Sequence, residues 1–189
     1  MRTDKAQQAI DAAIVLFGEQ GFDNTSTQSI AKQAGIGNAT LFKYFASKDV
    51  LIRDCYLDCK MDMFRTLKAD LDPNLAFEPF LRTIWLNYLK WAEANPQKLS
   101  FMQQITNSRF YDPEVEQKIE CELLFFQVAM KAAITNGEIL EEEPSVIQAT
   151  MVAFLNMAVA FKQTQPEIEE QRIYKLMLNS LKISESNPS

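Results

Sequence analysis

Histidine is absent from the 189 residues, and glycine and cysteine are scarce, with five and three residues respectively. Without histidine, neither a Ser-His-Asp triad nor a histidine metal site can form. The few glycines are too scattered for a Gly-rich phosphate-binding loop. An odd number of cysteines favours a reducing compartment over a disulfide framework. We therefore expect no enzyme, and we predict no cofactor and no metal site.

Long hydrophobic runs are also missing, since no stretch approaches about 18 uninterrupted apolar residues. The first residues, Met1–Asp11, are polar and charged and show no signal-peptide pattern. We expect a soluble, cytoplasmic protein that does not insert into a membrane. Strand-like alternation is rare, and apolar residues recur at helical spacing along the chain. The sequence therefore predicts an all-α fold.

Net charge is −6, which argues against a protein that coats nucleic acid along its whole surface. The charge is unevenly distributed along the chain. Residues 1–48 contain five basic and four acidic side chains, whereas residues 49–189 contain fourteen basic and twenty-one acidic ones. Because the acidic remainder would repel phosphates, any DNA contact is expected in the N-terminal part.

The chain is organised around Thr25–Lys48, which predicts two short helices joined by a tight turn. Ala31 is small enough for the second helix to cross closely, Gly35 supplies the turn, and Leu41 anchors the second helix. This spacing is typical of a helix-turn-helix, whose second helix enters the major groove of DNA. An ordinary αα-hairpin inside a helical bundle is the alternative interpretation.

Several side chains of this segment are able to reach phosphate oxygens. Lys48 is predicted in the first turn of a helix capped by Ser47, where the helix dipole disfavours a cation unless a phosphate is near. A solvated surface lysine is the alternative for Lys48. The hydroxyl and cationic candidates are Thr25, Ser26, Thr27, Thr40, Tyr44, Ser47 and Lys48.

The run GFDNTSTQSIAKQAGIGNATLFKYFASKDVL, residues 21–51, resembles the N-terminal DNA-binding domain of TetR-family transcriptional regulators. The chain departs from the family pattern at Gly37, where serine is usual, at Ala39, where glycine is usual, and at Phe42, where tyrosine is usual. Two of these departures remove a hydroxyl that is able to bind phosphate. Lys43 offers a cation on the same helix as a replacement.

The resemblance implies a dimeric, ligand-responsive repressor that binds a palindromic operator in double-stranded DNA and is released by a small apolar ligand. It implies a helix-turn-helix domain over residues 1–47 and a helical ligand-binding and dimerisation domain over residues 48–189, linked by a helix that starts near Lys48. The alternative is a helical small-molecule-binding protein without a role in gene regulation. Expected base-reading residues are Gln28, Asn38, Ala39 and Lys43, and expected phosphate contacts are Thr27, Thr40, Tyr44 and Lys48.

Caps, prolines and apolar periodicity predict nine helices in all. Thr3 is the expected cap of the first helix, and the tail Ser184–Ser189 is expected to fray. The predicted ranges are Asp4–Gln20, Thr27–Ala34, Asn38–Phe45, Lys48–Leu71, Leu75–Ala94, Gln97–Ser108, Pro113–Asn136, Ser145–Lys162 and Pro166–Ile183.

Met151–Phe161, MVAFLNMAVAF, has only Asn156 as a polar residue. A helix that is apolar on all sides is buried on more than one side. It is either a central core helix or a helix packed on its own domain and on a second subunit. In TetR-like proteins the last two long helices form the dimer interface. The residues expected there are Val152, Ala153, Asn156, Met157, Ala160, Tyr174, Met177 and Leu181.

The C-terminal part is rich in aromatic and methionine side chains, which form either a plain hydrophobic core or an apolar ligand pocket. The family resemblance implies a pocket between the fourth helix and the three that follow. We expect it to be lined by Phe64, Trp85, Tyr88, Phe101, Met102, Gln104, Phe125, Phe126 and Met130, with Asn87, Gln103, Asn107 and Gln127 as further polar candidates.

Two further clusters have a plain interpretation and a functional one. Cys55 and Cys59 share a helix face and with Cys121 offer three thiolates, although cysteine is commonly a small core residue. A row of four acidic residues is better explained as a solvated helix face than as paired catalytic carboxylates. The row consists of Glu114, Glu116, Glu120 and Glu122.

Overall fold

The computed structural model describes residues 3–72, 75–106, 108–165, 168 and 170–182. Over these residues the chain forms ten α-helices and one 3-10 helix, and no strand, which confirms the all-α prediction. The chain separates into two compact units. Unit 1 comprises Met1–Phe64 and Ala94–Cys121, and unit 2 comprises Arg65–Glu93 and Glu122–Ser189.

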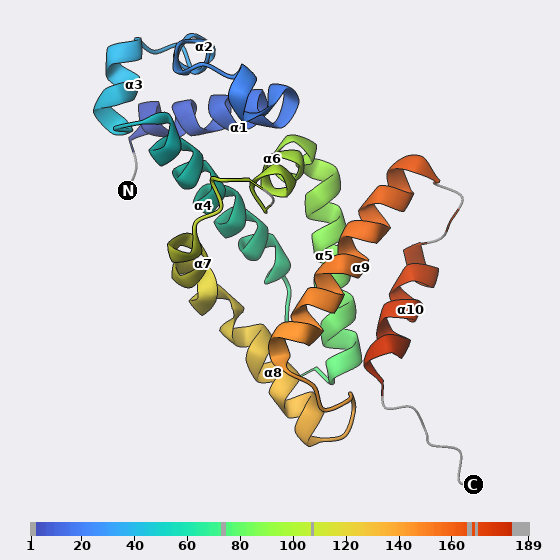
Figure 1. The fold of residues 1–189 in the computed structure, drawn as a ribbon. Coiled ribbons are helices and arrows are strands. Elements are labelled where there is room, and N and C mark those ends of the chain that lie inside the picture. The colour runs from blue at the N-terminus through green and yellow to red at the C-terminus, as the bar shows by residue number, and fades with distance from the viewer. Residues whose placement is uncertain (1–2, 73–74, 107, 166–167, 169, 183–189) are drawn as a thin grey trace, which may run out of the picture. The chain divides into compact units, whose positions relative to one another are not determined.

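Unit 1 begins with three helices that pack on one another, and the second and third form the predicted helix-turn-helix (Figure 1). Hydroxyl side chains cap three helices of this unit. The Thr3 hydroxyl accepts a hydrogen bond from the Ala6 N–H, the Ser26 hydroxyl accepts one from the Ser29 N–H, and the Ser47 hydroxyl accepts one from the Val50 N–H. The helices of this unit are α1 (Asp4–Asn24), α2 (Thr27–Gln33), α3 (Asn38–Tyr44), most of α4 (Lys48–Leu67), α6 (Pro96–Thr106) and α7 (Pro113–Ile119).

The core of unit 1 forms where α1 packs on α6. Ile10 and Phe17 of α1 and Phe101 of α6 are fully buried, and the rings of Phe17 and Phe101 stack with centroids 6.0 Å apart. Gly18 allows this close packing, because a Cβ atom there would lie 2.7 Å from the Gln97 carbonyl oxygen. α1 is interrupted at Gly21, whose φ of 78° and ψ of 172° are not helical, as predicted for the end of the first helix, and a further short turn of helix follows up to Asn24.

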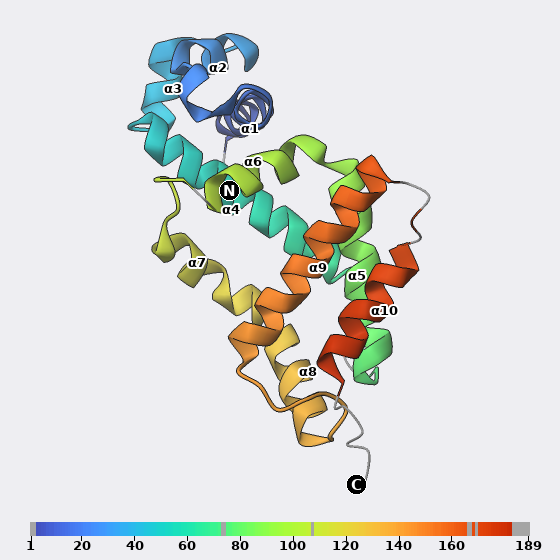
Figure 2. The ribbon, with the colours of Figure 1, turned by 45° about the vertical axis from the view of Figure 1, so that its right-hand side comes forward.

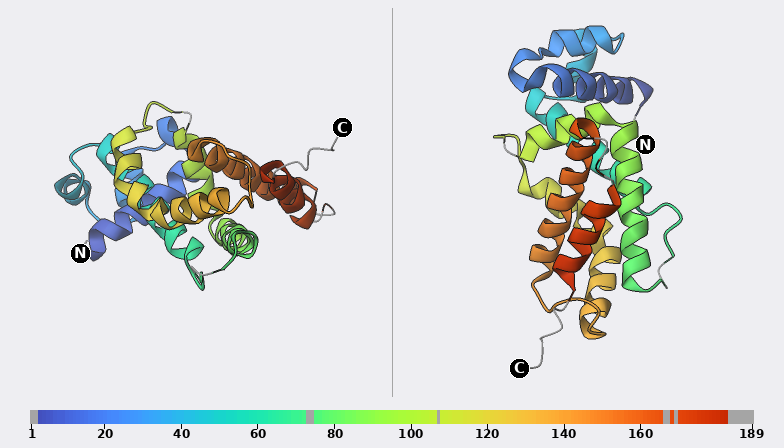
Figure 3. Two further views of the ribbon diagram at one scale, coloured as in Figure 1. Left: turned by 90° about the horizontal axis from the view of Figure 1, so that it is seen from below. Right: turned by 90° about the vertical axis from the view of Figure 1, so that its right-hand side faces the viewer.

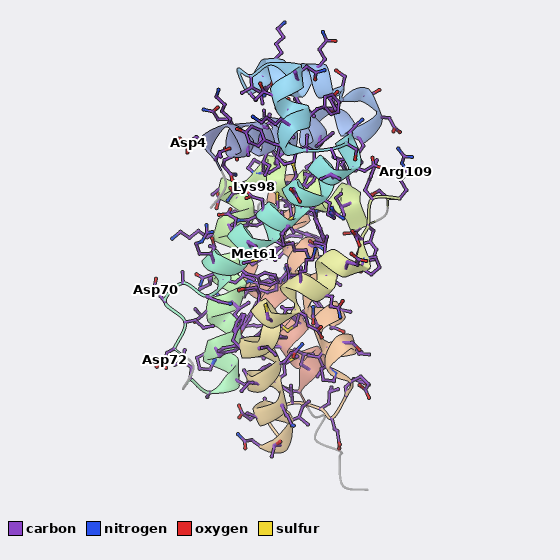
Figure 4. All side chains as sticks on the ribbon, turned by 90° about the vertical axis from the view of Figure 1, so that its left-hand side faces the viewer. Asp4, Met61, Asp70, Asp72, Lys98 and Arg109 are labelled. Atoms are coloured by element: carbon purple, nitrogen blue, oxygen red, sulfur yellow. The ribbon has the colours of Figure 1, made fainter. Side chains whose placement is uncertain are left out.

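α4 ends at Leu67, four residues before the predicted Leu71. Asp70 has a φ of 56°, a left-handed conformation that no α-helix continues through. The segment that carries Asp70 and Asp72, both labelled in Figure 4, therefore leaves the helix as a loop. Nothing in its sequence is strongly helix-breaking before Pro73, which explains why periodicity overestimated the length of the helix.

The single helix predicted over Pro113–Asn136 is wrong. The chain there forms α7, a 3-10 helix over Glu120–Leu123, and α8 (Leu124–Thr135). None of the four residues Glu120–Leu123 is buried, so no packing holds this turn to α-helical geometry. The chain also passes from unit 1 to unit 2 within this turn.

Unit 2 contains α5 (Phe77–Ala94, except its last residue), α8, α9 (Pro144–Thr164) and α10 (Glu170–Leu181). α9 and α10 lie side by side, as Figures 2 and 3 show from several directions. Asn156 of α9 accepts a 3.2 Å hydrogen bond from the Tyr88 hydroxyl of α5, and Arg82 forms a 2.7 Å ion pair with Glu170 of α10. These polar contacts fix the three helices around an aromatic core.

The remaining helix ends lie within two residues of the predictions, except at the last helix, where Pro166 and Ile183 lie outside the described residues. The expected fraying of Ser184–Ser189 also falls outside them. The compact units do not follow the division expected between residues 47 and 48, because unit 1 also takes in most of α4, α6 and α7. That division assigns functions rather than packing, and it stays a prediction.

Candidate nucleic-acid interface and apolar surfaces

The turn between α2 and α3 has the geometry that Gly35 predicts. Gly35 has a φ of 67°, its N–H donates to the Lys32 carbonyl at 3.2 Å, and the Ile36 N–H donates to the Ala31 carbonyl at 3.0 Å. This pair of bonds is the Schellman motif, which closes the end of a helix. The two helices are therefore joined by a turn that is fixed by backbone hydrogen bonds.

Only one side of α3 packs against the core of unit 1. Leu41 and Phe45 are 1% and 3% exposed and pack in the same core as Ile30 of α2. The other side of α3 carries two pairs of neighbouring residues, and the pairs lie one helical turn apart. All four residues are exposed: Asn38, Ala39, Phe42 and Lys43. We call these four residues the outer face of α3.

The four expected base-reading residues are all exposed. Asn38, Ala39 and Lys43 belong to the outer face of α3, and Gln28 is exposed on α2. Sequence reasoning did not place the fourth member, Phe42, among the site residues. Its position four residues after Asn38 and three after Ala39 is the signal that marks it as outward-facing.

The expected phosphate contacts occupy different environments. Tyr44 is exposed, and Thr27 and Thr40 are half-buried. The Lys48 ammonium donates a hydrogen bond to the Phe22 carbonyl and lies 5.9 Å from the centre of the Phe17 ring. Lys48 therefore ties the start of α4 to the end of α1, and its contact with phosphate stays a prediction.

Three of the candidate hydroxyls have structural partners. Thr25 is 1% exposed, and its hydroxyl lies 2.8 Å from the Gly21 carbonyl oxygen and 3.2 Å from that of Leu16. This buried position excludes Thr25 from a surface contact, contrary to expectation. Ser26 and Ser47 cap α2 and α4 respectively.

Polar bonds connect α4 to its neighbours inside unit 1. Tyr56 donates to the Glu116 carboxylate of α7, the Lys60 ammonium lies 3.7 Å from the same carboxylate, and Lys98, labelled in Figure 4, pairs with Asp62 at 2.6 Å. Burial raises the pKa of Tyr56 and lowers that of Lys60. The acidic row is thus not simply a solvated face, since Glu116 bonds to α4.

The residues expected in a ligand pocket divide between the two units. Phe64, Phe101, Met102 and Gln104 belong to unit 1, where Gln104 donates to the Phe17 carbonyl at 3.1 Å. Phe101 is part of the core described above. The other five expected residues, all in unit 2, are Trp85, Tyr88, Phe125, Phe126 and Met130. Asn107 lies outside the described residues.

Unit 2 contains a cavity of about 620 Å³ in which Phe125 is the one expected pocket residue. Its polar groups are at one end, where the Glu138 carboxylate accepts hydrogen bonds from the Phe77 N–H at 3.3 Å and from the Asn136 amide at 3.2 Å. The cavity is lined by Leu71, Leu75, Ala76, Phe77, Phe80, Leu124, Phe125, Val128, Ala129, Ala132, Ala133, Asn136 and Glu138.

α9 has one buried side and one apolar side that the described residues leave exposed. Val146 and Val152 are 48% and 47% exposed, and Met157 of the same side is half-buried, whereas Asn156 is bonded to Tyr88 of α5. We define the outer stripe of α9 as the apolar residues Val146, Ala149, Val152, Ala153, Met157 and Ala160.

α10 differs from expectation, because the three residues expected at a subunit interface are buried in unit 2. Tyr174, Met177 and Leu181 are at most 5% exposed, and the Tyr174 hydroxyl donates to the Glu78 carbonyl at 3.1 Å. The Tyr174 ring also packs edge-to-face on Trp85. α10 is strongly amphipathic, and its apolar side is buried inside unit 2, where α10 packs along α9 and Tyr174 contacts α5.

Within the described residues, α9 is the helix long and apolar enough to span a membrane, with 28% of its most apolar window buried. Core helices of soluble proteins satisfy the same criteria, so length and composition do not make it a membrane span. The described residues contain no group of three or more potential metal ligands among His, Cys, Asp and Glu. Cys55 and Cys59 are buried, and burial raises the pKa of Cys59 to about 12.

Comparison with known proteins shows which family the N-terminal segment resembles. Residues 9–55 match the family model of the bacterial regulatory proteins of the tetR family. A helix-turn-helix transcriptional regulator of Haemophilus influenzae is 31% identical over 104 residues, which cover 54% of this chain and 55% of that protein. A regulator of Bacillus subtilis, YhgD, is 19% identical over 180 residues, 94% of each chain.

A solved structure, a TetR-family transcription regulator from Shewanella sp. PV-4, covers 97% of this chain and 100% of its own, with a TM-score of 0.83 and 27% identity. These likenesses place the chain among the helix-turn-helix transcriptional regulators, which are DNA-binding proteins. Residues 9–55 form a DNA-binding domain of the TetR family, and the fold of the whole chain is similar to that of a TetR-family regulator. Members of this family are regulators rather than enzymes, and they typically act as dimers.

Proposed function

We propose that the protein is a cytoplasmic, dimeric repressor that binds a palindromic operator and is released by a small apolar ligand. Residues 1–47 would bind the operator, and residues 48–189 would bind the ligand and form the dimer. The observation that carries the proposal is the outer face of α3, which is exposed while the opposite side of the helix is fixed in the core.

The residues of this face have complementary recognition chemistry. Lysine commonly donates to guanine O6 and N7, and asparagine pairs with adenine. We assign these roles to Lys43 and Asn38, with Ala39 against the base edges and Gln28 reaching in from α2. Thr27, Thr40, Tyr44 and Lys48 would hold the backbone phosphates on either side.

The dimer is proposed from the outer stripe of α9. A continuous apolar stripe on one long helix is typical of a surface that is covered in the assembled protein. A single reading helix contacts too few base pairs for specificity, so two copies related by a two-fold axis would read a palindrome. The half-sites would be separated by about one helical turn, roughly 34–36 Å, or a multiple of it.

The ligand site is proposed in the cavity of unit 2. Its volume falls within the usual range for small-molecule sites, about 300–1,000 Å³, and its lining is apolar with few polar groups. No basic side chain lines it, which favours a neutral or cationic apolar ligand over an acidic one. Ligand would release the operator if it binds more tightly to a conformation in which the two reading helices no longer fit the half-sites.

Selection of bound sequences from a random DNA pool tests this function. We expect a two-fold symmetric consensus, protected from nuclease, with an affinity that falls steeply as salt rises. Transcription from a promoter overlapping that site should fall when the protein is added. Selection without any consensus would reject the proposal. Binding of apolar molecules in that case would favour the alternative, a binding protein without a regulatory role.

A further inference from the structure

Phe42 is the most unusual residue of the outer face of α3. Its side chain is 45% exposed, although phenylalanine is usually buried, and it lies between Asn38, Ala39 and Lys43 in the helical register. The core side of the helix is already occupied by Leu41 and Phe45. Phe42 is therefore directed at whatever α3 binds, and its ring has no group that donates or accepts a conventional hydrogen bond.

We propose that Phe42 recognises thymine, by packing its ring on the C5 methyl group that thymine exposes in the major groove. This inference rests on the proposed function. The thymine methyl is the apolar feature of a base edge in that groove, and phenylalanine and alanine are side chains that contact it. Ala39, one turn earlier on the same face, adds a second apolar contact beside it.

The neighbours of Phe42 place the thymine within the half-site. Asn38 and Lys43 flank the ring along the helix, so the thymine should lie between the bases that these two residues read. Each half-site is thus expected to carry at least one thymine whose methyl group, rather than its hydrogen-bonding edge, determines affinity.

A protein partner suits this face less well than DNA. The apolar area consists of one ring and one methyl group, which is far smaller than a stable protein interface. Lys43 on the same face and Lys32 on α2 are exposed cations, and charge complementarity favours a polyanion. The small apolar area of the face matches a single thymine methyl group, and its positive charge matches the phosphates of DNA.

The experiment replaces thymine by uracil, one position at a time, in the selected operator. This exchange removes the methyl group and leaves the hydrogen-bonding groups unchanged. With wild-type protein we expect about a fourfold loss of affinity per half-site at one position, the value of one buried methyl group, and about 15-fold when both half-sites are changed.

Variants of Phe42 assign the effect to this ring. Phe42→Ala should bind the thymine operator more weakly and bind the uracil operator no worse than the thymine one. Phe42→Leu, which keeps an apolar side chain, should retain a preference for thymine. Thermal melting of both variants should match the wild type, because Phe42 is exposed and its loss leaves no cavity in the core.

The outcomes separate the two proposals. A consensus that binds thymine and uracil equally at every position would overturn the role of Phe42 and leave the regulator intact. A uracil penalty of the same size in Phe42→Ala would overturn it as well. Failure to select any DNA would overturn the regulator itself and this inference with it.

Discussion

The two units differ in the apolar side chains that they leave exposed. Among the described residues, the large exposed apolar side chains of unit 1 are Phe42, Tyr44, Met61 and Tyr111, and two of these four lie on α3. In unit 2 they are all aliphatic: Leu75, Leu86, Leu124, Val128, Val146, Val152 and Leu176. Unit 1 thus presents aromatic groups beside polar ones, which suits base edges, whereas unit 2 presents aliphatic surface, which suits apolar partners.

The N-terminal segment and the rest of the chain also differ in charge. Residues 49–189 carry the whole excess of acidic charge, and residues 1–48 are slightly basic. The N-terminal segment therefore resembles a surface built for a polyanion. The remainder resembles one built for a second subunit and a ligand. Four experiments test these differences between the two parts of the molecule.

The largest effect is expected on the outer stripe of α9. Ala153→Glu would place a charge at the centre of an apolar interface and should weaken association by several kcal/mol, at least a hundredfold. Light scattering measures the oligomeric state, and operator binding should fall with it.

The matched control is Ala69→Glu, which makes the same exchange at an exposed alanine in the loop after α4. It should leave the oligomeric state unchanged. Ala158→Glu is unsuitable as a test of association, since Ala158 is 2% exposed inside its own unit and the variant would disturb folding instead. A monomeric wild type at micromolar concentration would contradict the dimer.

The second effect concerns the close packing in unit 1. Gly18→Ala would bring a Cβ within 2.7 Å of the Gln97 carbonyl oxygen, so the α1–α6 contact must open. We expect unfolding free energy to fall by about 1–3 kcal/mol, measured by urea denaturation.

Gly37→Ala is the comparison variant, because its Cβ would lie 3.7 Å from the Thr40 hydroxyl oxygen, an ordinary contact. It should cost clearly less than Gly18→Ala. Equal losses for the two variants would show that the packing of α1 on α6 is looser than the structure indicates.

The third effect concerns Lys48, which bonds the Phe22 carbonyl. If Lys48 also contacts phosphate, Lys48→Ala should weaken binding to all sequences about equally and lower the salt slope by about one. Affinity measured at several salt concentrations tests this.

Lys118→Ala removes an exposed cation from α7 of the same unit and should leave the slope unchanged. A lower melting temperature for Lys48→Ala together with an unchanged salt dependence of DNA affinity would show that Lys48 has a structural role and does not contact phosphate. The melting temperature and the salt slope together thus separate the two roles.

The smallest expected effect concerns the rates at which a thiol reagent labels the three cysteines. Thiols react as thiolates, and burial raises the pKa of Cys59 to about 12, so this thiol stays protonated at pH 8. In the native protein a thiol reagent should label exposed Cys121 rapidly and buried Cys55 and Cys59 slowly. Denaturant should make all three equivalent, and Cys121→Ser should abolish the rapid phase. Rapid labelling of a second thiol would show that α4 opens locally.

The N-terminal helices could be predicted because their signals are local. Gly35 needs a left-handed turn, Ser26 and Ser47 cap the helices that follow them, and Leu41 repeats at helical spacing. Each signal acts within four residues, so one sequence is sufficient to read it.

The C-terminal surfaces depend on partners that are distant in sequence. Tyr174 and Met177 have the same periodicity as interface residues, and only the packing of α10 within unit 2 shows that they are buried inside the chain. Phe101 was expected in a pocket, yet α6 packs on α1 and brings it into another core. Periodicity reveals that a face is buried, without revealing which neighbour buries it.

The residues of α3 that face outward are different from those that fold the helix. Asn38, Ala39, Phe42 and Lys43 are exposed, while the turn and the anchor of the helix depend on Gly35 and Leu41. Substitutions at the four outer positions should therefore be nearly neutral for folding. Target preference can drift, or be re-engineered by randomising these positions in a library, without a compensating change elsewhere in the chain.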